Sequence, residues 1–436
     1  MPRIAVVVLD TLRKDSFDQH FDWLPGTRFE NAWSTSHYTV PAHGSLLTGR
    51  YPSETGVNAR SEDFDYPHPS LPELLQEAGF TTRAFSENFL FSPLNSFDRG
   101  FSSFVTGGRA TVLDSEIFPW KETISELSGS GISRDLKAIN KCILSEYATL
   151  SSLRYGWKLK RDNFDGTKEA IEFVNNAEFG DDEFVFFNLM QAHLPYDPPA
   201  SHRSVDPVSR DPESEANTIL AGDVDLTIER QLYDDCARYL SEIYEVLFES
   251  LSNSFDYIFT LSDHGELFGE HGAIKHWYGV YPELTHVPMV LYDGDDEIET
   301  NKNLVSILDI HQTILDIVGI EHDSRGNDLR EDTERDVCLT EFNGLRDERI
   351  ERLQNRNISL DVINKYDRDQ HGIALSPDNY GYETPNGFRQ RGSCPPDDLQ
   401  DRLQSVISSL DKRGSTDERK SYSDDLMNHL KDLGYA

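Results

Sequence analysis

The sequence predicts an α/β fold, in which a mainly parallel sheet has helices on both faces and a smaller subdomain follows at the C-terminus. Short apolar runs alternate along the chain with segments of helical periodicity, and this alternation is typical of parallel sheets flanked by helices. After about residue 345 the composition becomes more polar and richer in arginine. We therefore expect a main domain over residues 1–345 and a C-terminal subdomain with a helical tail over residues 346–436.

Three apolar runs have the length and composition of buried parallel strands, and polar residues follow each of them. The runs are Ile4–Leu9 before Asp10, Glu183–Met190 before His193, and Asp256–Leu261 before Asp263 and His264. Ligand sites of open α/β sheets lie at the carboxyl ends of the strands. The three polar clusters are therefore expected at one rim of the sheet.

Two segments between these runs have the periodicity of helices. Leu71–Ala78 precedes a glycine, and apolar residues recur at three- and four-residue steps from Leu226 to Leu251, which gives the longer segment one apolar face. Residues 101–165 mix charged residues with Gly and Ser. We expect this stretch to form an insertion over the sheet edge.

The charge of the chain restricts its partners. The 436 residues include 41 Lys+Arg and 77 Asp+Glu, a formal net charge of −36, which repels phosphate backbones and anionic lipid surfaces. We therefore expect a small-molecule substrate and no nucleic acid. Only 13 of the basic residues are Lys, and so acidic and lysine-poor a surface is expected in a halophilic cytoplasm, where salt screens the self-repulsion.

The sequence shows neither a membrane anchor nor an export signal. The early apolar run Ile4–Leu9 is far shorter than the roughly 20 residues that span a bilayer. The four cysteines are scattered without a C-x-x-C pair, which favours free thiols in a reducing compartment. A cytoplasmic protein is therefore expected.

The segment around Thr39 is the most informative part of the chain. Pro41 suits the first turn of a helix that continues to Gly49, so Thr39 is expected at a helix N-terminus, where backbone N–H groups favour an anion. His43, four residues later, would share its face and could hydrogen-bond Thr39 or an ester oxygen. Taken alone, the segment also fits an N-capping threonine followed by a surface histidine.

A second cluster follows the third predicted strand. Residues 261–272 contain two histidines and three carboxylates, and the adjacent Asp263 and His264 can bind the same divalent cation. Together with Asp10 and Thr39 they supply four ligands for one metal that also binds a nucleophile. A threonine hydroxyl is too weakly acidic to ionise at neutral pH without a metal or a base, and such a metal would meet this need. A solvated acidic loop is the alternative interpretation.

Taken in order, these motifs resemble those of the sulfatases within the alkaline phosphatase superfamily over roughly the first 345 residues. Residues 10–13 look like the first metal segment of that family, 39–52 like its nucleophile signature, 193–196 like its His-x-Pro-Tyr substrate segment and 262–266 like its second metal segment. The resemblance implies an alkaline-phosphatase-like fold and an ester hydrolase that forms a covalent intermediate on a metal-bound nucleophile.

The chain departs from the sulfatases proper at the nucleophile. They have Cys or Ser, converted to formylglycine, and an Arg four residues later, whereas this chain has Thr39 and His43. At this site it is therefore more similar to the superfamily's Thr-nucleophile members, such as phosphodiesterases and lipoteichoic acid synthases. The imidazole of His264 replaces an amide and favours Mn²⁺ or Zn²⁺, with Ca²⁺ still open. One divalent cation is expected.

The resemblance also implies roles for residues around the nucleophile. Arg13 or His43 is expected to neutralise charge on the substrate. His193 and the pair Lys275 and His276 are candidates for protonating the leaving alcohol.

Asn88 lies in the region where the family has a substrate-contacting Lys-x-His segment, and it is a further candidate for substrate binding. Three functions fit all of these residues. The first is hydrolysis of sulfate or phosphate (di)esters of a small molecule or glycan, and the second is transfer of a phosphoryl-linked group to a sugar or lipid hydroxyl. The third is a catalytically silent binding protein on the same fold, against which the complete set of ligands weighs. The oligomeric state is left open.

Overall fold

Two sheets and their helices make up the part of the chain that the computed structural model describes. The described residues are 2–113, 118, 120, 123–124, 127, 132–149, 152–153, 156–157, 165–207, 225–332, 335–376 and 378–414.

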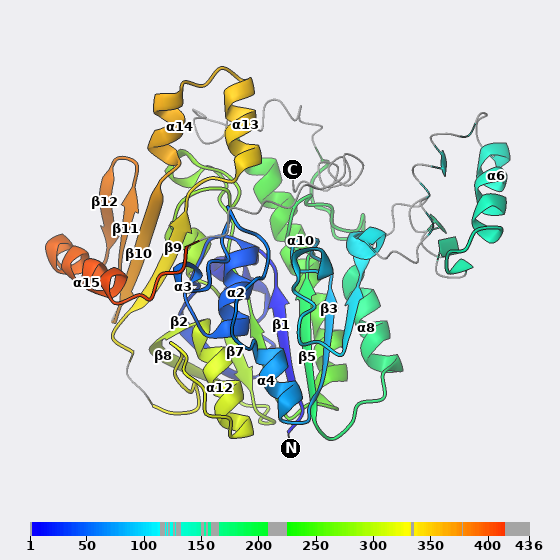
Figure 1. Ribbon diagram of the computed structural model, residues 1–436, viewed down its shortest axis with the longest axis horizontal. Helices are drawn as coiled ribbons and strands as arrows, with labels where there is room; N and C mark the ends of the chain where they lie inside the picture. Colours follow the sequence, from blue (N-terminus) through cyan, green and yellow to red (C-terminus); the bar gives the residue numbers. More distant parts are fainter. Residues whose placement is uncertain are drawn as a thin grey trace.

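An eight-stranded sheet forms the centre of the molecule, in the order β4-β3-β5-β1-β6-β7-β2-β8 (Figure 1). Its strands are β1 (Ile4–Leu9), β2 (Gly26–Trp33), β3 (Thr81–Ser86), β4 (Ser103–Thr106), β5 (Glu183–Leu189), β6 (Tyr257–Leu261), β7 (Met289–Tyr292) and β8 (Ile298–Ser306). Within the described residues, β7 runs antiparallel to its neighbours β6 and β2, and the other strand pairs are parallel. The mainly parallel sheet predicted from the sequence is confirmed.

The three apolar runs singled out in the sequence are three neighbouring strands. β1 pairs in parallel with β5 on one side and with β6 on the other, and all three are almost entirely buried. Because parallel strands end at the same edge, the polar residues that follow them meet at one rim.

Helices cover both faces of this sheet, as predicted. The helices and short 3₁₀ turns of this part of the chain, of which α6 lies away from the sheet (Figure 1), are α1 (Lys14–His20), α2 (Thr39–Thr48), α3 (Pro52–Thr55), α4 (Leu71–Glu77), η1 (Pro93–Asn95), η2 (Gly108–Leu113), α6 (Ile132–Ile143), α8 (Gly166–Asn176), α10 (Thr227–Ser252), η3 (Glu270–Gly272), α11 (Pro282–Thr285) and α12 (Leu308–Val318).

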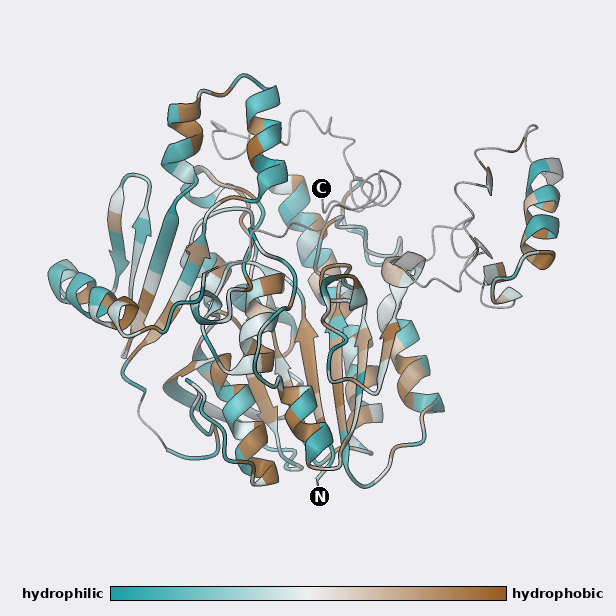
Figure 2. Ribbon diagram, viewed as in Figure 1, coloured by the Kyte–Doolittle hydropathy of each residue, from teal (hydrophilic) through white to brown (hydrophobic). Residues whose placement is uncertain are grey.

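Alternate residues of β1 point to the two faces. Val6 and Val8 pack with α2, α4 and α12, whereas Val7 and Leu9 pack with α1, α8 and α10. Figure 2 shows the resulting pattern, with apolar central strands and helices that are hydrophilic on their outer sides. No helix within the described ranges combines the length and apolar character needed to cross a membrane.

A separate antiparallel sheet follows, in the order β12-β11-β10-β9. Its strands and helices are β9 (Cys338–Asn343), α13 (Asp347–Asn355), α14 (Leu360–Tyr366), β10 (Asp369–Leu375), β11 (Asn379–Thr384), β12 (Gly387–Arg391) and α15 (Pro396–Ser408).

The second sheet is joined to the segment that leads to Thr39. The Glu341 backbone N–H donates to the Thr35 carbonyl at 2.8 Å, the Thr340 hydroxyl donates to the Ser34 carbonyl at 2.6 Å, and Tyr380 stacks on Trp33 with ring centroids 4.2 Å apart. The C-terminal sheet thus helps to position the approach to α2.

The expected insertion and the expected domain boundary differ from the elements of the structure. Residues 103–106 form β4, an edge strand of the main sheet, so the insertion expected over 101–165 does not include them. Strand β9 begins the second sheet on the N-terminal side of residue 345, and the domain boundary at 345 stays a prediction. Of the predicted C-terminal tail, residues 415–436 lie outside the described residues.

Candidate active site

Asp10, Thr39, Asp263 and His264 converge at the carboxyl edge of the main sheet. Asp10 directly follows β1, Asp263 and His264 follow β6, and Thr39 begins α2. All four side chains are buried. One possible ligand atom from each of Asp10, Asp263 and His264 lies within 4.8 Å of the other two, so the structure brings these predicted metal ligands together.

This donor set fits a divalent cation. The buried Asp263 Oδ2 has no hydrogen-bond partner in the described part of the chain, and it lies 3.6 Å from His264 Nε2. The distance from that nitrogen to Asp10 Oδ1 is 3.9 Å. His264 Nδ1 donates to the Gly265 carbonyl at 3.0 Å, so its Nε2 lone pair is left for a ligand. Two carboxylates and one imidazole suit Mn²⁺, Zn²⁺ and, less selectively, Ca²⁺.

The two carboxyl groups differ in their pKa values. Burial alone would raise both, but the coulombic attraction of neighbouring histidines, His193 above all, and the hydrogen bond from Thr11 outweigh it at Asp10 and lower the pKa of that carboxyl to about 2. At Asp263 burial is reinforced by the Asp10 carboxylate, and the pKa of Asp263 is raised well above its usual range. Two buried carboxylates this close repel each other, and a cation between them would remove that repulsion.

The Thr39 hydroxyl faces this cluster. Its Oγ1 lies 3.2 Å from His264 Nε2 and 3.4 Å from Asn88 Nδ2. The N-cap of α2 is Tyr38, in an extended conformation, and Thr39 is the first helical residue. The capping-threonine interpretation is therefore wrong, and the hydroxyl points to the ligands instead.

The backbone turns sharply after Asp10. Thr11 has a φ of 65°, which is unusual for a β-branched residue and is associated with functional sites. In this conformation its N–H donates to Asp263 Oδ1 at 3.2 Å and its hydroxyl to Asp10 Oδ1 at 2.7 Å. A Cβ at Gly265 would lie 2.1 Å from the Glu283 carbonyl oxygen, so only glycine allows the backbone after His264 to pass this close.

His43 forms its hydrogen bond with the backbone carbonyl of Thr39 and not with the hydroxyl. It is fully buried, its Nδ1–H donates to the Thr39 carbonyl at 2.9 Å, and its Nε2 accepts from Asn188 Nδ2 at 3.0 Å. Burial lowers the pKa of His43 to about 4, although Asp10 works in the opposite direction. A neutral imidazole in this position supports the start of α2 and does not supply positive charge to a substrate.

Arg13 also differs from its expected place. Its guanidinium pairs with Asp15 at 2.8 Å and with Glu270 at 2.8 Å, and it donates to the Glu266 carbonyl at 2.8 Å. The charge of Arg13 is therefore compensated by carboxylates of the protein, of which Glu270 lies on the loop that follows β6. Asn88 likewise faces a ligand, because its Nδ2 donates to Asp10 Oδ2 at 2.7 Å.

A small cavity of about 30 Å³ lies over Thr39. Its lining consists of His37, Tyr38, Thr39, Ala59, Leu90, His193, His276, Trp277, Gly344, Arg346 and Arg349. The predicted proton donors His193 and His276 are both in this lining. Lys275 is not, and its ammonium lies over the Trp277 ring, 4.3 Å from the centroid.

His276 is held by a buried carboxylate. Its Nδ1 donates to Glu266 Oε1 at 3.2 Å, and Tyr196 donates to the other oxygen of Glu266 at 2.6 Å. The His276 ring lies 4.6 Å from that of His264 and 5.2 Å from that of His193. Burial and these two histidines lower the pKa of His276 well below its usual range.

Sequence reasoning missed several residues of this site. Asn188, in β5, donates to both Asp10 Oδ2 at 3.1 Å and His43 Nε2 at 3.0 Å, and a polar side chain within an apolar strand was its only signal. Trp277, Arg346 and Arg349 line the cavity. Both arginines lie in the arginine-rich segment after residue 345. Composition alone does not show which of its residues reach the site.

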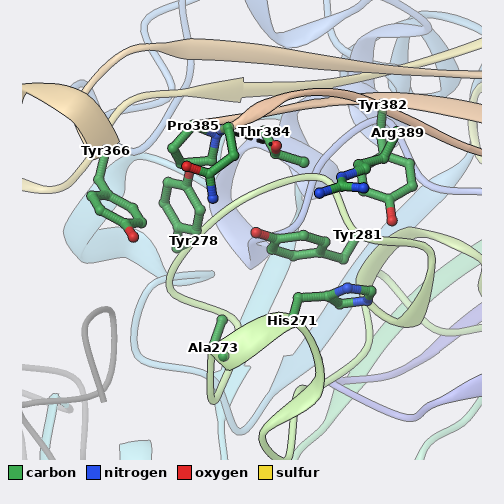
Figure 3. Close-up of a pocket in the computed structure, with 11 residues that line it drawn as sticks. His271, Ala273, Tyr278, Tyr281, Tyr366, Tyr382, Thr384, Pro385 and Arg389 are labelled. Carbon is green, nitrogen blue, oxygen red and sulfur yellow. Dashed lines mark hydrogen bonds between the residues drawn. The ribbon is translucent and has the colours of Figure 1, made fainter. Parts of the chain in front are cut away.

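A larger cavity, of about 560 Å³, lies apart from the nucleophile. Figure 3 shows Tyr366 beside Tyr278 at one end of its lining, and Tyr382 and Arg389 near Tyr281 at the other. None of the residues that line it is a predicted site residue. Its lining residues come from the loop after β6, from α14 and from the C-terminal sheet.

Comparisons with known proteins find relatives of this chain among the sulfatases. An uncharacterized sulfatase of Escherichia coli (strain K12), YidJ, is 21% identical over 319 residues, which are 68% of this chain and 61% of that relative. The chain therefore matches less than two thirds of the length of this relative.

Solved structures with a similar fold cover nearly the whole chain. The phosphonate monoester hydrolase of Agrobacterium radiobacter superposes with a TM-score of 0.59 at 16% identity, over 94% of this chain and 92% of that one. A protein in complex with its substrate D-glucosamine-2-N,6-O-disulfate superposes with a TM-score of 0.58 at 15% identity, over 93% and 97%.

A family model described as Sulfatase matches residues 17–320, which is most of the chain. The match includes Thr39, Asp263 and His264, and the fold is that of alkaline-phosphatase-like sulfatases. The chain belongs to the sulfatase family.

Proposed function

We propose that the protein is a metal-dependent hydrolase that cleaves sulfate or phosphate (di)esters with Thr39 as its nucleophile. The proposal rests on the position of Thr39. Its Oγ1 lies 3.2 Å from His264 Nε2, and the residue lines the small cavity. A divalent cation held by Asp10, Asp263 and His264, whether Mn²⁺, Zn²⁺ or Ca²⁺, would supply Lewis-acid chemistry that acidifies the hydroxyl and draws charge from the ester.

The chain's own residues account for the remaining steps. Thr39 Oγ1 gives its proton to solvent water and forms a bond to sulfur or phosphorus as the bond to the leaving oxygen breaks. His193, or His276 once the negative charge of the bound ester has raised its lowered pKa, donates a proton to the leaving oxygen. Water then attacks the covalent ester on Thr39, which releases the anion and restores the hydroxyl. The backbone N–H groups at the start of α2 favour the negative charge of the ester group.

The central test is the substitution of Thr39. The metal-loaded wild type should hydrolyse at least one of 4-nitrophenyl sulfate, 4-nitrophenyl phosphate and bis(4-nitrophenyl) phosphate, and a chelator should abolish this activity. Thr39→Ala should lower kcat by roughly a thousandfold or more, and mass spectrometry of quenched wild-type enzyme should find a sulfo or phospho group on Thr39.

A matched control is Thr48→Ala at the other end of α2. That hydroxyl is also buried but donates to the Gly44 carbonyl at 2.7 Å, so its loss should leave kcat within about threefold. Full activity in Thr39→Ala would refute the proposal. A wild type that binds these anions without cleaving them would favour the silent binding protein.

Leaving groups can separate the roles of His193 and His276. The 4-nitrophenolate ion leaves readily without a proton, whereas phenolate leaves less readily. The histidine that acts as general acid should therefore lose about tenfold more activity on phenyl esters than on 4-nitrophenyl esters when replaced by Asn. Equal losses on both esters would assign that histidine to binding.

The relatives bear on the substrate. The structural neighbour bound to D-glucosamine-2-N,6-O-disulfate acts on a sulfated sugar, and the phosphonate monoester hydrolase acts at phosphorus. Both support a small-molecule or glycan ester for this chain. Transfer of the group from Thr39 to an added sugar alcohol, detected in the products, would indicate a phosphotransferase.

We also propose that the protein works in a salt-rich cytoplasm. The net charge of −36 supports a salt-rich medium, because screening lowers the repulsion between like charges. The four cysteines are free thiols in the structure, which supports a reducing compartment. Activity assays at low and high KCl test the first point.

A further inference from the structure

Arg349 is a cation beside the nucleophile that forms no ion pair with any carboxylate of the described residues. It lines the small cavity together with Thr39, His193 and His276. Within the described residues, its guanidinium has no hydrogen bond or ion pair, and its close contact is the Trp277 ring, with the guanidinium carbon 3.2 Å from the centroid.

The neighbouring arginine of the same cavity is different. Arg346 also lines it, but its guanidinium pairs with Glu62 at 2.8 Å and approaches Glu348 at 3.7 Å. The charge of Arg346 is compensated by the protein. Arg349 is attracted by Glu348 without forming an ion pair, and burial, Arg352 and Arg346 outweigh that attraction.

A purely structural role explains Arg349 poorly. It lies in the first turn of α13, where the helix dipole disfavours a cation. It shares the Trp277 ring with Lys275, whose ammonium is 4.3 Å from the centroid, so two cations are drawn to one ring. Burial and the charges of Arg352 and Arg346 lower the pKa of Arg349. A guanidinium stays protonated even so. Arg349 therefore keeps a positive charge that the binding of an anion would stabilise.

The shape of the cavity places that anion on the leaving part of the substrate. A volume of about 30 Å³ has room for little more than the ester group itself. Thr39, His193 and His276 are buried, whereas Trp277 and Arg349 keep partial exposure. The remainder of the substrate must therefore extend past Trp277 and Arg349 towards solvent.

We propose that Arg349 and Trp277 form a subsite for a second oxyanion, a carboxylate or sulfate, on the leaving part of the substrate. The preferred substrate is then an ester whose alcohol carries its own negative charge. This inference rests on the proposed function, since it assumes that the ester group binds at Thr39. It narrows the substrate class and adds no step to the reaction.

Binding of non-cleavable anions tests the subsite. Benzenesulfonate carries one anionic group, and 3- and 4-sulfobenzoate carry a carboxylate in addition at two different reaches. Calorimetry with the wild type, in the presence of Ca²⁺ and separately of Mn²⁺, should show at least one sulfobenzoate binding about tenfold or more tightly than benzenesulfonate. The test is stringent because the net charge of −36 opposes the binding of a dianion.

Variants of two neighbouring arginines identify the cation. Arg349→Gln should reduce the preference for the sulfobenzoate to about one and leave benzenesulfonate binding nearly unchanged. Arg352→Gln removes the same charge from the same helix, at a residue that does not line the cavity, and should keep the preference. If Arg349→Gln does not fold, Arg349→Met, which retains packing on Trp277, takes its place.

The outcomes are separable. No preference for either sulfobenzoate in the wild type, or an unchanged preference in Arg349→Gln, would overturn the subsite while benzenesulfonate still binds. Equal loss of preference in Arg352→Gln would also overturn it, because general electrostatics would then suffice. Failure of the wild type to bind any sulfonate would count against the proposed function and against the subsite with it.

Discussion

Asp263 shows at the scale of one residue why this site is organised for a ligand. One of its oxygens accepts from two backbone N–H groups, those of Thr11 at 3.2 Å and His264 at 3.0 Å. The other oxygen is buried without any partner that the described residues provide. An unsatisfied buried carboxylate costs free energy, so this arrangement disfavours the metal-free fold and favours cation binding.

Asn188 should be essential for orientation although it does not touch the cavity. It joins the ligand Asp10 to His43 through two hydrogen bonds. Asn188→Ala should therefore raise the Kd of the activating metal and lower kcat/KM, each by about 10- to 100-fold, as is usual for groups that orient metal ligands. Metal titration followed by activity, together with circular dichroism of the fold, measures both. A variant with wild-type metal affinity and kinetics would contradict this role.

Glu87 provides a prediction about pH. It is buried, and burial with the nearby Asp165 and Glu169 raises its pKa well above the ordinary value of 4.5. The folded form therefore holds this proton more tightly than the unfolded chain. The stability that Glu87 contributes is present below pH 4.5 and is lost as the pH rises through the raised pKa.

Glu87→Gln should remove this loss. The free energy of unfolding from urea titration should be about 1 to 2 kcal/mol higher than in the wild type at about pH 8, and the difference should vanish near about pH 4. Glu172→Gln removes the same charge from an exposed position on α8 and should show no such pH dependence. A difference between Glu87→Gln and the wild type that did not vary with pH would show that the pKa of Glu87 is the same in the folded and unfolded states.

At the scale of elements, helix α2 connects the nucleophile to the core. Its first residue is Thr39, all ten of its residues are buried, and it ends at Gly49 with a φ of 65°. The N–H of Gly49 donates to the Ser45 carbonyl at 2.8 Å. The end of the helix is packed against α12 and the loop after it, since a Cβ at Gly49 would lie 2.6 Å from Ser324 Cβ and 2.7 Å from His311 Nδ1.

Gly49→Ala should therefore destabilise the protein by about 2 to 4 kcal/mol, through the left-handed backbone and the overlap together. Gly319→Ala is a matched control at the end of α12. That glycine has a φ of 80° but no atom within 4 Å of a Cβ, so its substitution should cost only about 1 kcal/mol. Urea denaturation of both variants measures the difference, and equal losses would show that the packing around Gly49 is loose enough to adapt.

At the scale of the whole molecule, charge and fold act against each other. The chain has 77 acidic against 41 basic residues. Folding brings the excess negative charges closer together than they are in the unfolded chain, so they repel one another. Many ion pairs, such as Arg325 with Glu54 at 2.5 Å and Arg413 with Asp65 at 3.0 Å, reduce this repulsion locally. They do not remove the net charge.

Salt should accordingly stabilise the protein. Raising KCl from about 0.1 M to about 1 M shortens the screening length from about 10 Å to about 3 Å, and the melting temperature should rise in the same series, by about 1 °C for each kcal/mol of stabilisation in a chain of this length. Choline chloride should act similarly, because screening does not depend on the identity of the cation. A melting temperature that is flat in both salts would show that the net charge does not limit stability.

Much of this molecule could be predicted from local sequence patterns. The runs that became β1, β5 and β6 are apolar over lengths typical of strands, and Asp10, Asp263 and His264 directly follow two of them. Hydrophobic periodicity and strand ends are properties of consecutive residues. For this reason the sequence by itself determined the mainly parallel sheet, its ligand-bearing edge and the helix that begins at Thr39.

The tertiary structure alone decided which other side chains meet there. Asn188 is 178 residues from Asp10 and 145 from His43, and the C-terminal segment brings Arg349 to the cavity over Thr39. It also decided that Arg13 pairs with Asp15 and Glu270. Contacts between distant segments depend on how sheets and helices pack, and no pattern of neighbouring residues contains that information.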